Sequence, residues 1–306
     1  MISRRKLLGA CALCAVVTAL SHPAAAQSWK AQYPELVLAI VPSENASGVT
    51  ERYKPFVDYL AQEIGTKVTL RVANDYAAVI EGHRAGNIQI GYHGPSSYVR
   101  AWTVTNGGVE PFVTTINADK SVGYYSVLYT KASNPASKLE DLKGTNLCLV
   151  DPNSASGNNV PRYSLSKRGI DPDTFFSKVV YAGSHENAVM ALEQGTCDAA
   201  FNWWNSETDS NLTRMANKKM VKLENFKTVF RSDLIAGSPY IYLSSLPAEL
   251  KAAISKAFLD APTKAKEAYD KLSDGKDLGF HPVTNKDYAD TLELQKFVDN
   301  LRRKRS

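Results

Sequence analysis

The chain has 306 residues, and its 36 Lys and Arg against 31 Asp and Glu leave a formal net charge of +5 at pH 7. This length suits one large domain or two smaller ones. Beyond the N-terminus, basic residues gather at 302–305, which is typical of a solvated tail. No basic stripe carries interleaved aromatic residues, so we expect no nucleic-acid partner.

The N-terminus has the pattern of a secretory signal peptide. Residues 3–6 are mostly basic, residues 7–20 are apolar but too few to span a bilayer, and the alanines at 24–26 offer a cleavage site. We therefore predict a signal peptide over 1–26 and a location in the periplasm or another extracytoplasmic space.

The export route stays open at this point. Arg4 and Arg5 are compatible with twin-arginine as well as Sec export, and Cys11 does not exclude a lipid anchor. Removal of the signal peptide leaves 33 basic against 31 acidic residues, a net charge of +2, so the mature chain is nearly neutral.

Strands and helices alternate in the first part of the mature chain. Apolar runs predict strands, and apolar residues at helical spacing predict helices. The predicted strands are 36–41, 68–72 and 88–92, and the predicted helices are 49–63, 76–85 and 96–102. This order implies a parallel sheet with helices on both faces.

The alternation repeats after a long extended stretch at 109–131. Strands are predicted at 147–150, 178–181 and 197–201, and helices at 160–167 and 186–193. Further strands at 229–230 and 240–243 precede helices at 247–258 and 287–301. We expect this C-terminal part to pack back on the first unit.

The prediction is thus an α/β fold of two lobes, each a mainly parallel sheet flanked by helices. Lobe one comprises 27–120 and 236–306, and lobe two comprises 121–235. Two crossing segments join the lobes and leave a cleft between them, where ligands of such sheets bind at the carboxyl ends of the strands.

Two cysteines remain in the mature chain, Cys148 and Cys197, and both fall on predicted buried strands. An oxidising compartment favours one disulfide between them. Two buried free thiols are the alternative, because the sequence does not give the geometry.

The run at 151–159 contains two hydroxyl side chains, Ser154 and Ser156, between a predicted strand and a predicted helix. Free amides and the helix dipole at such a point favour a tetrahedral oxyanion. An ordinary helix cap is the alternative, since Ser and Asn are common capping residues.

Polar residues also follow the third predicted strand of each unit. His93 and Ser96 follow the strand at 88–92, and Asn205 follows the strand at 197–201. Because these strand ends belong to the two lobes, we expect their tips to point into the same cleft.

Four motifs occur in order: GYHGPSSY at 91–98, GYYSVLY at 123–129, DPNSASG at 151–157 and GSHENA at 183–188. Together they resemble the phosphonate-binding proteins of ABC importers, within the wider phosphate, phosphite and phosphonate substrate-binding family, over residues 35 to 260. The resemblance implies a type II periplasmic binding protein that closes on its ligand and delivers it to a membrane permease.

The resemblance also implies roles for individual residues. Ser154, the backbone of Ala155, and Ser156 would hold the oxyanion, and His185 would add a donor. Tyr76 and Tyr124 would close over the ligand. The alternatives are a helix-capping role for His185 and a core role for the two tyrosines.

One departure from the family pattern concerns the ligand's substituent. Members that take aminoalkylphosphonates hold the ammonium group with acids, whereas the matching positions here are Asn205 and Ser238. Glu207 and Asp209 lie near enough in the chain to substitute. From Asn205 and Ser238 we expect a ligand without an amine, such as a small alkylphosphonate, phosphite or phosphate-like anion.

We expect a monomer with no cofactor, no metal and no catalytic residue. The histidines lack metal-ligand spacing, and no G-x-S-x-G nucleophile motif is present. Two alternatives remain: a ligand-sensing protein that acts on a sensor partner, and an enzyme that acts on phosphonates.

Overall fold

The computed structural model describes residues 29–303. The predicted signal peptide and Cys11 lie outside these residues. Among the helices of the described part, none is both long and apolar enough to cross a membrane. The first element is the short helix α1 (Trp29–Gln32), which precedes the first of two sheets.

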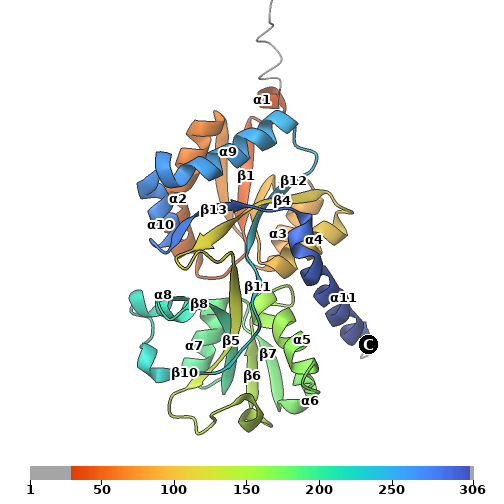
Figure 1. Ribbon diagram of the computed structural model, residues 1–306, viewed down its shortest axis with the longest axis vertical. Coiled ribbons are helices and arrows are strands. Elements are labelled where there is room, and N and C mark those ends of the chain that lie inside the picture. The colour runs from red at the N-terminus through yellow and green to blue at the C-terminus, as the bar shows by residue number, and fades with distance from the viewer. Residues whose placement is uncertain (1–28, 304–306) are drawn as a thin grey trace, which may run out of the picture.

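Six strands form the sheet of lobe one, the upper lobe in Figure 1. Their order across the sheet is β13 (Asp277–Pro282), β4 (Val109–Asn117), β12 (Pro239–Leu243), β3 (Ile90–Tyr92), β1 (Glu35–Ile40) and β2 (Lys67–Val72). The pairs of β1 with β2 and β3 are parallel, as the alternating pattern predicts. Strand β12 pairs antiparallel with β3 and β4, and β13 pairs antiparallel with β4, so the sheet is mixed.

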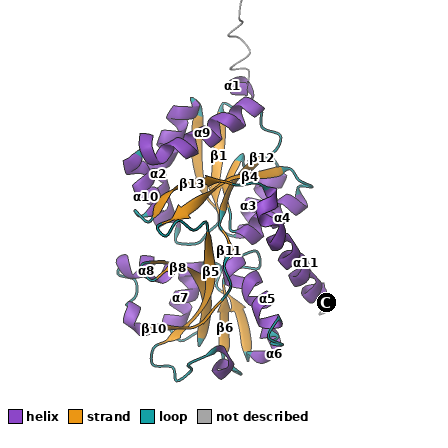
Figure 2. Ribbon diagram, viewed as in Figure 1, coloured by secondary structure: helices purple, strands orange, loops and turns teal. Residues whose placement is uncertain are grey.

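Helices cover this sheet because each has one apolar face (Figure 2). They are α2 (Ala46–Ile64), α3 (Tyr76–Arg84), α4 (Pro95–Val104), α9 (Ala248–Lys264) and α10 (Lys266–Ser273). Buried aromatic rings join α2, α9 and the sheet: Phe258 meets Phe56 and Tyr240 edge-on, with centroids 5.0 and 4.7 Å away. Edge-on pairs add to the energy of area burial.

Five strands form the main path of the second sheet, in lobe two. The order is β10 (Phe226–Arg231), β5 (Gly123–Lys131), β8 (Ala199–Ser206), β6 (Asn146–Leu149) and β7 (Lys178–Tyr181), with β11 (Ile235–Ala236) on β5 and β9 (Asp209–Ser210) on β8. Its helices are α5 (Val160–Ser166), α6 (Pro172–Phe175), α7 (His185–Glu193) and α8 (Asn211–Asn217). Short turns complete the order: η1 (Leu139–Leu142), η2 (Ala155–Asn159), η3 (Leu223–Asn225) and η4 (Asn285–Tyr288).

The chain passes between the sheets twice, between β4 and β5 and between β10 and β12 (Figure 1). The predicted extended stretch at 109–131 is therefore two strands, one in each sheet. At Gly237 in the second passage, a Cβ would meet the Thr114 side chain and the Val122 carbonyl oxygen. Glycine at this position lets the two passages lie against each other.

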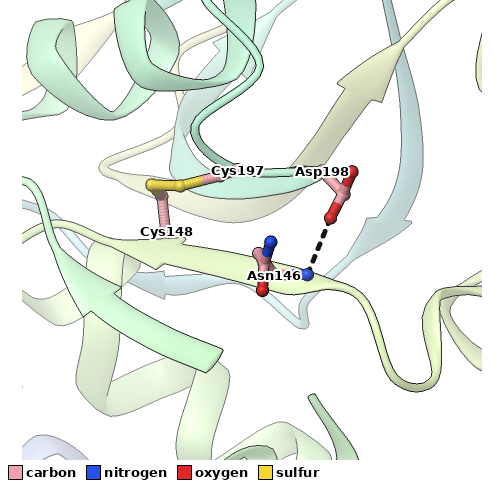
Figure 3. Close-up of a disulfide and its surroundings, with 4 residues drawn as sticks. All are labelled: Asn146, Cys148, Cys197 and Asp198. Atoms are coloured by element: carbon pink, nitrogen blue, oxygen red, sulfur yellow. Dashed lines mark hydrogen bonds between the residues drawn. A yellow bond between two sulfur atoms is a disulfide. The ribbon is translucent and has the colours of Figure 1, made fainter. Parts of the chain in front are cut away.

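A disulfide joins Cys148 and Cys197, as predicted (Figure 3). Cys148 lies on β6, and Cys197 lies two residues before β8, the parallel neighbour of β6. The Cα atoms are 5.8 Å apart, and the Asp198 carboxylate accepts a 2.8 Å hydrogen bond from the Asn146 amide beside the bridge. The bridge therefore lies inside lobe two.

The last helix, α11 (Ala289–Arg303), contacts both lobes and not only the first (Figure 1). Its Asp299 pairs with Arg100 of α4 at 2.6 Å. On the other side, Phe297 meets the Tyr163 ring of α5 at 5.3 Å, and Arg302 donates to the Pro152 carbonyl at 2.8 Å. The helix thus bridges the lobes beside their junction.

Candidate ligand-binding site

A cavity of about 120 Å³ lies between the lobes. This volume is below the roughly 300–1,000 Å³ of pockets that hold drug-sized ligands, so the cavity suits a small molecule. Eight of the ten predicted ligand-binding residues line it: Tyr76, Tyr124, Ser154, Ala155, Ser156, His185, Asn205 and Ser238.

The serine run forms the start of the helix that follows β6. Ser154 is the N-cap, and its hydroxyl accepts a 3.0 Å hydrogen bond from the Gly157 amide. A π-helical turn, η2, comes next and leads directly into α5. The amides of Ala155 and Ser156 are in the first turn, where no intrahelical acceptor exists. Two N–H groups and two hydroxyls therefore lie at a cavity wall that favours negative charge.

Gly157 sets the approach of this turn to the sheet. A Cβ at Gly157 would collide with the Val150 side chain and lie 2.8 Å from the Ser154 hydroxyl oxygen. The Ser126 hydroxyl of β5 donates to the Ser156 carbonyl at 2.6 Å and holds the turn from the other side. The first-turn amides are thus fixed in place before any ligand arrives.

Two tyrosines face the serines. The Tyr76 hydroxyl interacts with Ser154, and the Tyr124 hydroxyl interacts with Ser156 and Ser238. Burial raises the pKa of both phenols above the usual value, so both stay protonated and can donate hydrogen bonds to an anion. Tyr76 comes from α3 of lobe one and Tyr124 from β5, next to the first passage between lobes.

The Nε2 atom of His185 lies 3.5 Å from the Ser154 hydroxyl oxygen. Its Nδ1 atom is 2.9 Å from the Asn202 side-chain oxygen, which also accepts from the Trp203 amide. An amide oxygen can only accept, so Nδ1 carries the proton and Nε2 is bare in the neutral ring. Burial lowers the pKa of His185 to about 4. The neutral ring therefore offers an acceptor, and it donates to a ligand only when a second proton binds.

The structure places His93 and Ser96 away from the cavity, against the expectation that they face it. Both are fully buried in lobe one, and the His93 Nδ1 atom is 3.2 Å from the Ser97 hydroxyl. Ser96 lies in the first turn of α4, which Gly94 caps and Pro95 begins, and its side chain turns toward the interior; His93 precedes the cap, and its ring packs against that of His83, with centroids 5.3 Å apart. Of this tip, Tyr92 and Gly94 line the cavity.

Three charged residues that lie outside the motifs also line the cavity: Arg52 of α2, Arg214 of α8 and Asp277 of β13. Arg52 pairs with Glu44 and donates to the Leu272 carbonyl at 2.6 Å. Arg214 lies 3.6 Å from Asp209 and 3.3 Å from Asp274. Helical spacing alone gives no signal for Arg52 and Arg214, and Asp277 lies beyond the region covered by the motifs.

Asn205 and Ser238 line the cavity with neutral groups, as expected. The Asn205 amide nitrogen donates to Asp209 at 2.6 Å, and the Ser238 carbonyl accepts from the Thr114 hydroxyl at 3.0 Å. Asp209 is buried and reaches Asn205 and Arg214, but it does not line the cavity. The suggestion that Asp209 acts directly on the ligand therefore gains no support from its position.

Comparison with known proteins agrees with this geometry. The family model described as the periplasmic substrate-binding protein of phosphonate ABC transporters matches residues 38–288. The phosphate-import protein PhnD of Mycolicibacterium smegmatis is 32% identical over 273 residues, which cover 84% of each chain. The phosphonates-binding periplasmic protein of Escherichia coli is 31% identical over 248 residues, covering 80% of this chain and 70% of that protein.

Solved structures give the same relationship at the level of the fold. The binding protein component of an ABC phosphonate transporter from Pseudomonas aeruginosa superposes with a TM-score of 0.77 at 26% identity, and 86% of each chain is covered. The two-lobed arrangement is thus shared over nearly the whole described chain.

Proposed function

The chain belongs to the family of periplasmic substrate-binding proteins of phosphonate ABC transporters, and we propose that it captures a small phosphorus oxyanion at the serine turn Ser154–Ser156. One relative carries the name of a phosphate importer and another that of a phosphonate-binding protein, so both anions belong to the proposed ligand class.

One observation carries this proposal: the first-turn amides and hydroxyls of a helix line a cavity of small volume between the lobes. Neutral donors at a helix start bind an anion through directed hydrogen bonds and the dipole. Tyr76 and Tyr124 add two further donors from above the turn. These donors suit the several oxygens of a phosphonate or phosphate group.

Capture and release follow from the two lobes. In this proposal, the open protein takes the anion on lobe two, and lobe one then closes about the passages near 119–124 and 231–238. Closure removes the anion from water and adds Tyr76. The ligand can favour closure only by binding the closed form more tightly than the open form.

The partner in this proposal is the permease of an ABC importer, which receives the ligand from a monomeric binding protein outside the cytoplasm. The family supports an extracytoplasmic location. The signal peptide at 1–26 and the lobe boundaries at 120 and 236 are parts of the same proposal.

A ligand screen by thermal unfolding tests the function. Methylphosphonate, phosphite, phosphate and sulfate are added to the mature protein, and a ligand at 100 times its Kd stabilises the fold by about 2.7 kcal/mol. We expect a rise in melting temperature with at least one phosphorus anion. A rise with none of them, or with sulfate alone, would contradict the proposal.

A further inference from the structure

Asp277 is a carboxylate on the cavity wall whose partner is missing. It is the first residue of β13 and pairs in register with Asn117 of β4, which also lines the cavity. Within residues 29–303, its side chain makes no hydrogen bond or ion pair with another residue, although Arg52 and Arg214 lie near enough to act on it electrostatically.

The two arginines near Asp277 already form ion pairs with other acidic residues. Arg52 is paired with Glu44, and Arg214 lies between Asp209 and Asp274. The groups that act on Asp277 are Arg52 from α2, Arg214 from α8, Asp209 from β9, Asp274 at the end of α10, Tyr92 from β3 and Tyr269 from α10. With Asp277 included, three carboxylates share two arginines, and Arg52 is also paired with Glu44, so this end of the cavity has room for one positive charge.

Asp277 is half-buried, and an unpaired carboxylate in such a position is costly. A buried charge is tolerated when it is paired and hydrogen-bonded, and otherwise the group tends to take up a proton. Burial raises the pKa of Asp277 to about 7, which agrees with a missing partner. The hydroxyl of Tyr269, also on the cavity wall, is buried without a hydrogen-bond partner in the described chain.

We propose that Asp277 is a specificity-determining residue that binds a cationic group on the ligand's substituent, such as the ammonium group of an aminoalkylphosphonate. This inference rests on the proposed function, in which Ser154–Ser156 hold the phosphorus group. It reverses the expectation of an amine-free ligand, which rested on the neutral residues Asn205 and Ser238 and considered only Glu207 and Asp209 as acids that could replace them. The acid comes here from the C-terminal strand of lobe one.

Two ligands of matched size separate charge from shape. In 2-aminoethylphosphonate an ammonium group ends the substituent, and in n-propylphosphonate a methyl group takes that place. Calorimetry on the mature protein should give a preference for the amine of roughly ten- to a hundredfold, the range for a hydrogen bond to a charged group. In Asp277→Asn we expect that preference to disappear while n-propylphosphonate still binds, which also demonstrates that the variant is folded.

Asp274→Asn is the matched control. It removes the same charge from a residue that acts on Asp277 but does not line the cavity, and Asn tolerates the left-handed backbone at this position, where φ is 52°. This variant should keep the preference for the amine.

Four results would overturn the inference: no amine preference in the natural protein, an unchanged preference in Asp277→Asn, an equal loss in Asp274→Asn, or an equal loss of phosphate binding in Asp277→Asn. If methylphosphonate or phosphate still binds the natural protein, only the role of Asp277 fails. If no phosphorus anion binds at all, the proposed function fails with it.

Discussion

Lys218 of lobe two donates a 2.6 Å hydrogen bond to Glu44 of lobe one and a 3.0 Å hydrogen bond to Glu186 of its own lobe. Glu186 in turn accepts from the Asn45 amide of lobe one at 2.7 Å. Burial opposes ionisation of Glu44, but Arg52 and Lys218 outweigh it and lower the pKa of Glu44 to about 2. These ionised groups join the lobes next to the cavity, because Arg52 pairs with Glu44 and also lines the cavity.

Replacement of Lys218 should therefore weaken ligand binding without a change in the cavity wall. Lys218→Met leaves two buried carboxylates short of a donor in the closed form, at a cost of about 1–3 kcal/mol. We expect the affinity for methylphosphonate to fall roughly five- to a hundredfold, measured by calorimetry. Lys222→Met, at an exposed residue, is the control. Equal affinity in the Lys218 and Lys222 variants would show that the ionic contact does not favour closure.

Ser154→Ala removes a donor to the ligand and the cap of the turn at once. Loss of a partner for a charged oxygen should weaken methylphosphonate binding by about 1–3 kcal/mol, and loss of the cap should lower stability by about 1 kcal/mol. Calorimetry and urea unfolding measure the two effects separately. Ser210→Ala removes the cap of α8, whose hydroxyl accepts from the Thr213 amide at 3.1 Å, outside the cavity. It should lose stability only, and a matching loss of affinity there would contradict the role of Ser154.

Ligand binding should be linked to one proton. The neutral His185 ring has a bare Nε2 atom, so a complex with an anion gains a hydrogen bond when either the ring or the ligand carries an added proton. The affinity for methylphosphonate should then rise as the pH falls from 8 to 6. Titrations in buffers of different ionisation enthalpy count the protons. His185→Gln should flatten the pH dependence, and a dependence of the same slope in that variant would rule out this linkage.

The stability of the unliganded fold should fall in acid because of buried neutral histidines. Burial lowers the pKa of His83 to about 4 and that of His93 well below its usual value. Above about pH 6.5 neither state binds these protons, and below it only the unfolded state does. Each histidine should then remove about 1.4 kcal/mol per pH unit until the folded ring also titrates.

Urea unfolding at pH 8, 7, 6 and 5 measures this loss. His83→Gln should show a shallower decline between pH 6.5 and 5 than the natural protein. His281→Gln changes an exposed histidine and should leave the decline as it is. A decline that is the same in all three proteins would mean that other groups cause it.

Removal of the disulfide should cost stability but not affinity. The bridge closes a loop with a sequence separation of 49 residues, which corresponds to about 4 kcal/mol in the chain-entropy model. The double variant Cys148→Ala, Cys197→Ala should lose about this free energy of unfolding and keep its affinity for methylphosphonate, because neither cysteine lines the cavity. A large loss of affinity would indicate that the bridge positions the serine turn.

Local patterns predicted much of the site. The serine turn, His185 and Tyr124 lie in short motifs at helix starts or strand ends, and Tyr76 lies at the start of the helix predicted at 76–85. Asp277 could not be found in this way, because it reaches the cavity through antiparallel pairing of β13 with β4, more than a hundred residues away in the chain. The expectation for Ser96 was wrong because the start of α4 turns this side chain inward, and the expectation for His93 was wrong because its ring packs against His83 inside lobe one.

The local sequence pattern also predicts the parallel βαβ parts of the fold, but it does not predict where the antiparallel strands pair. Strands β1, β2 and β3 pair as their alternation with helices predicts. Strands β12 and β13 return from lobe two and from α10, so their places depend on tertiary packing. The bridging position of α11 has the same origin, since its apolar face fits helices of both lobes.

The bridging helix α11 contacts the two lobes through groups of different charge. On lobe one, its Asp299 forms an ion pair with Arg100. On lobe two, its Arg302 donates hydrogen bonds to the neutral oxygens of Pro152 and Asn159. When the lobes part, the neutral contacts are the ones that yield more readily. If the lobes open as proposed, we expect the helix to move with lobe one and to uncover the outer side of the serine turn, so that an empty cavity would change the outer surface of the protein.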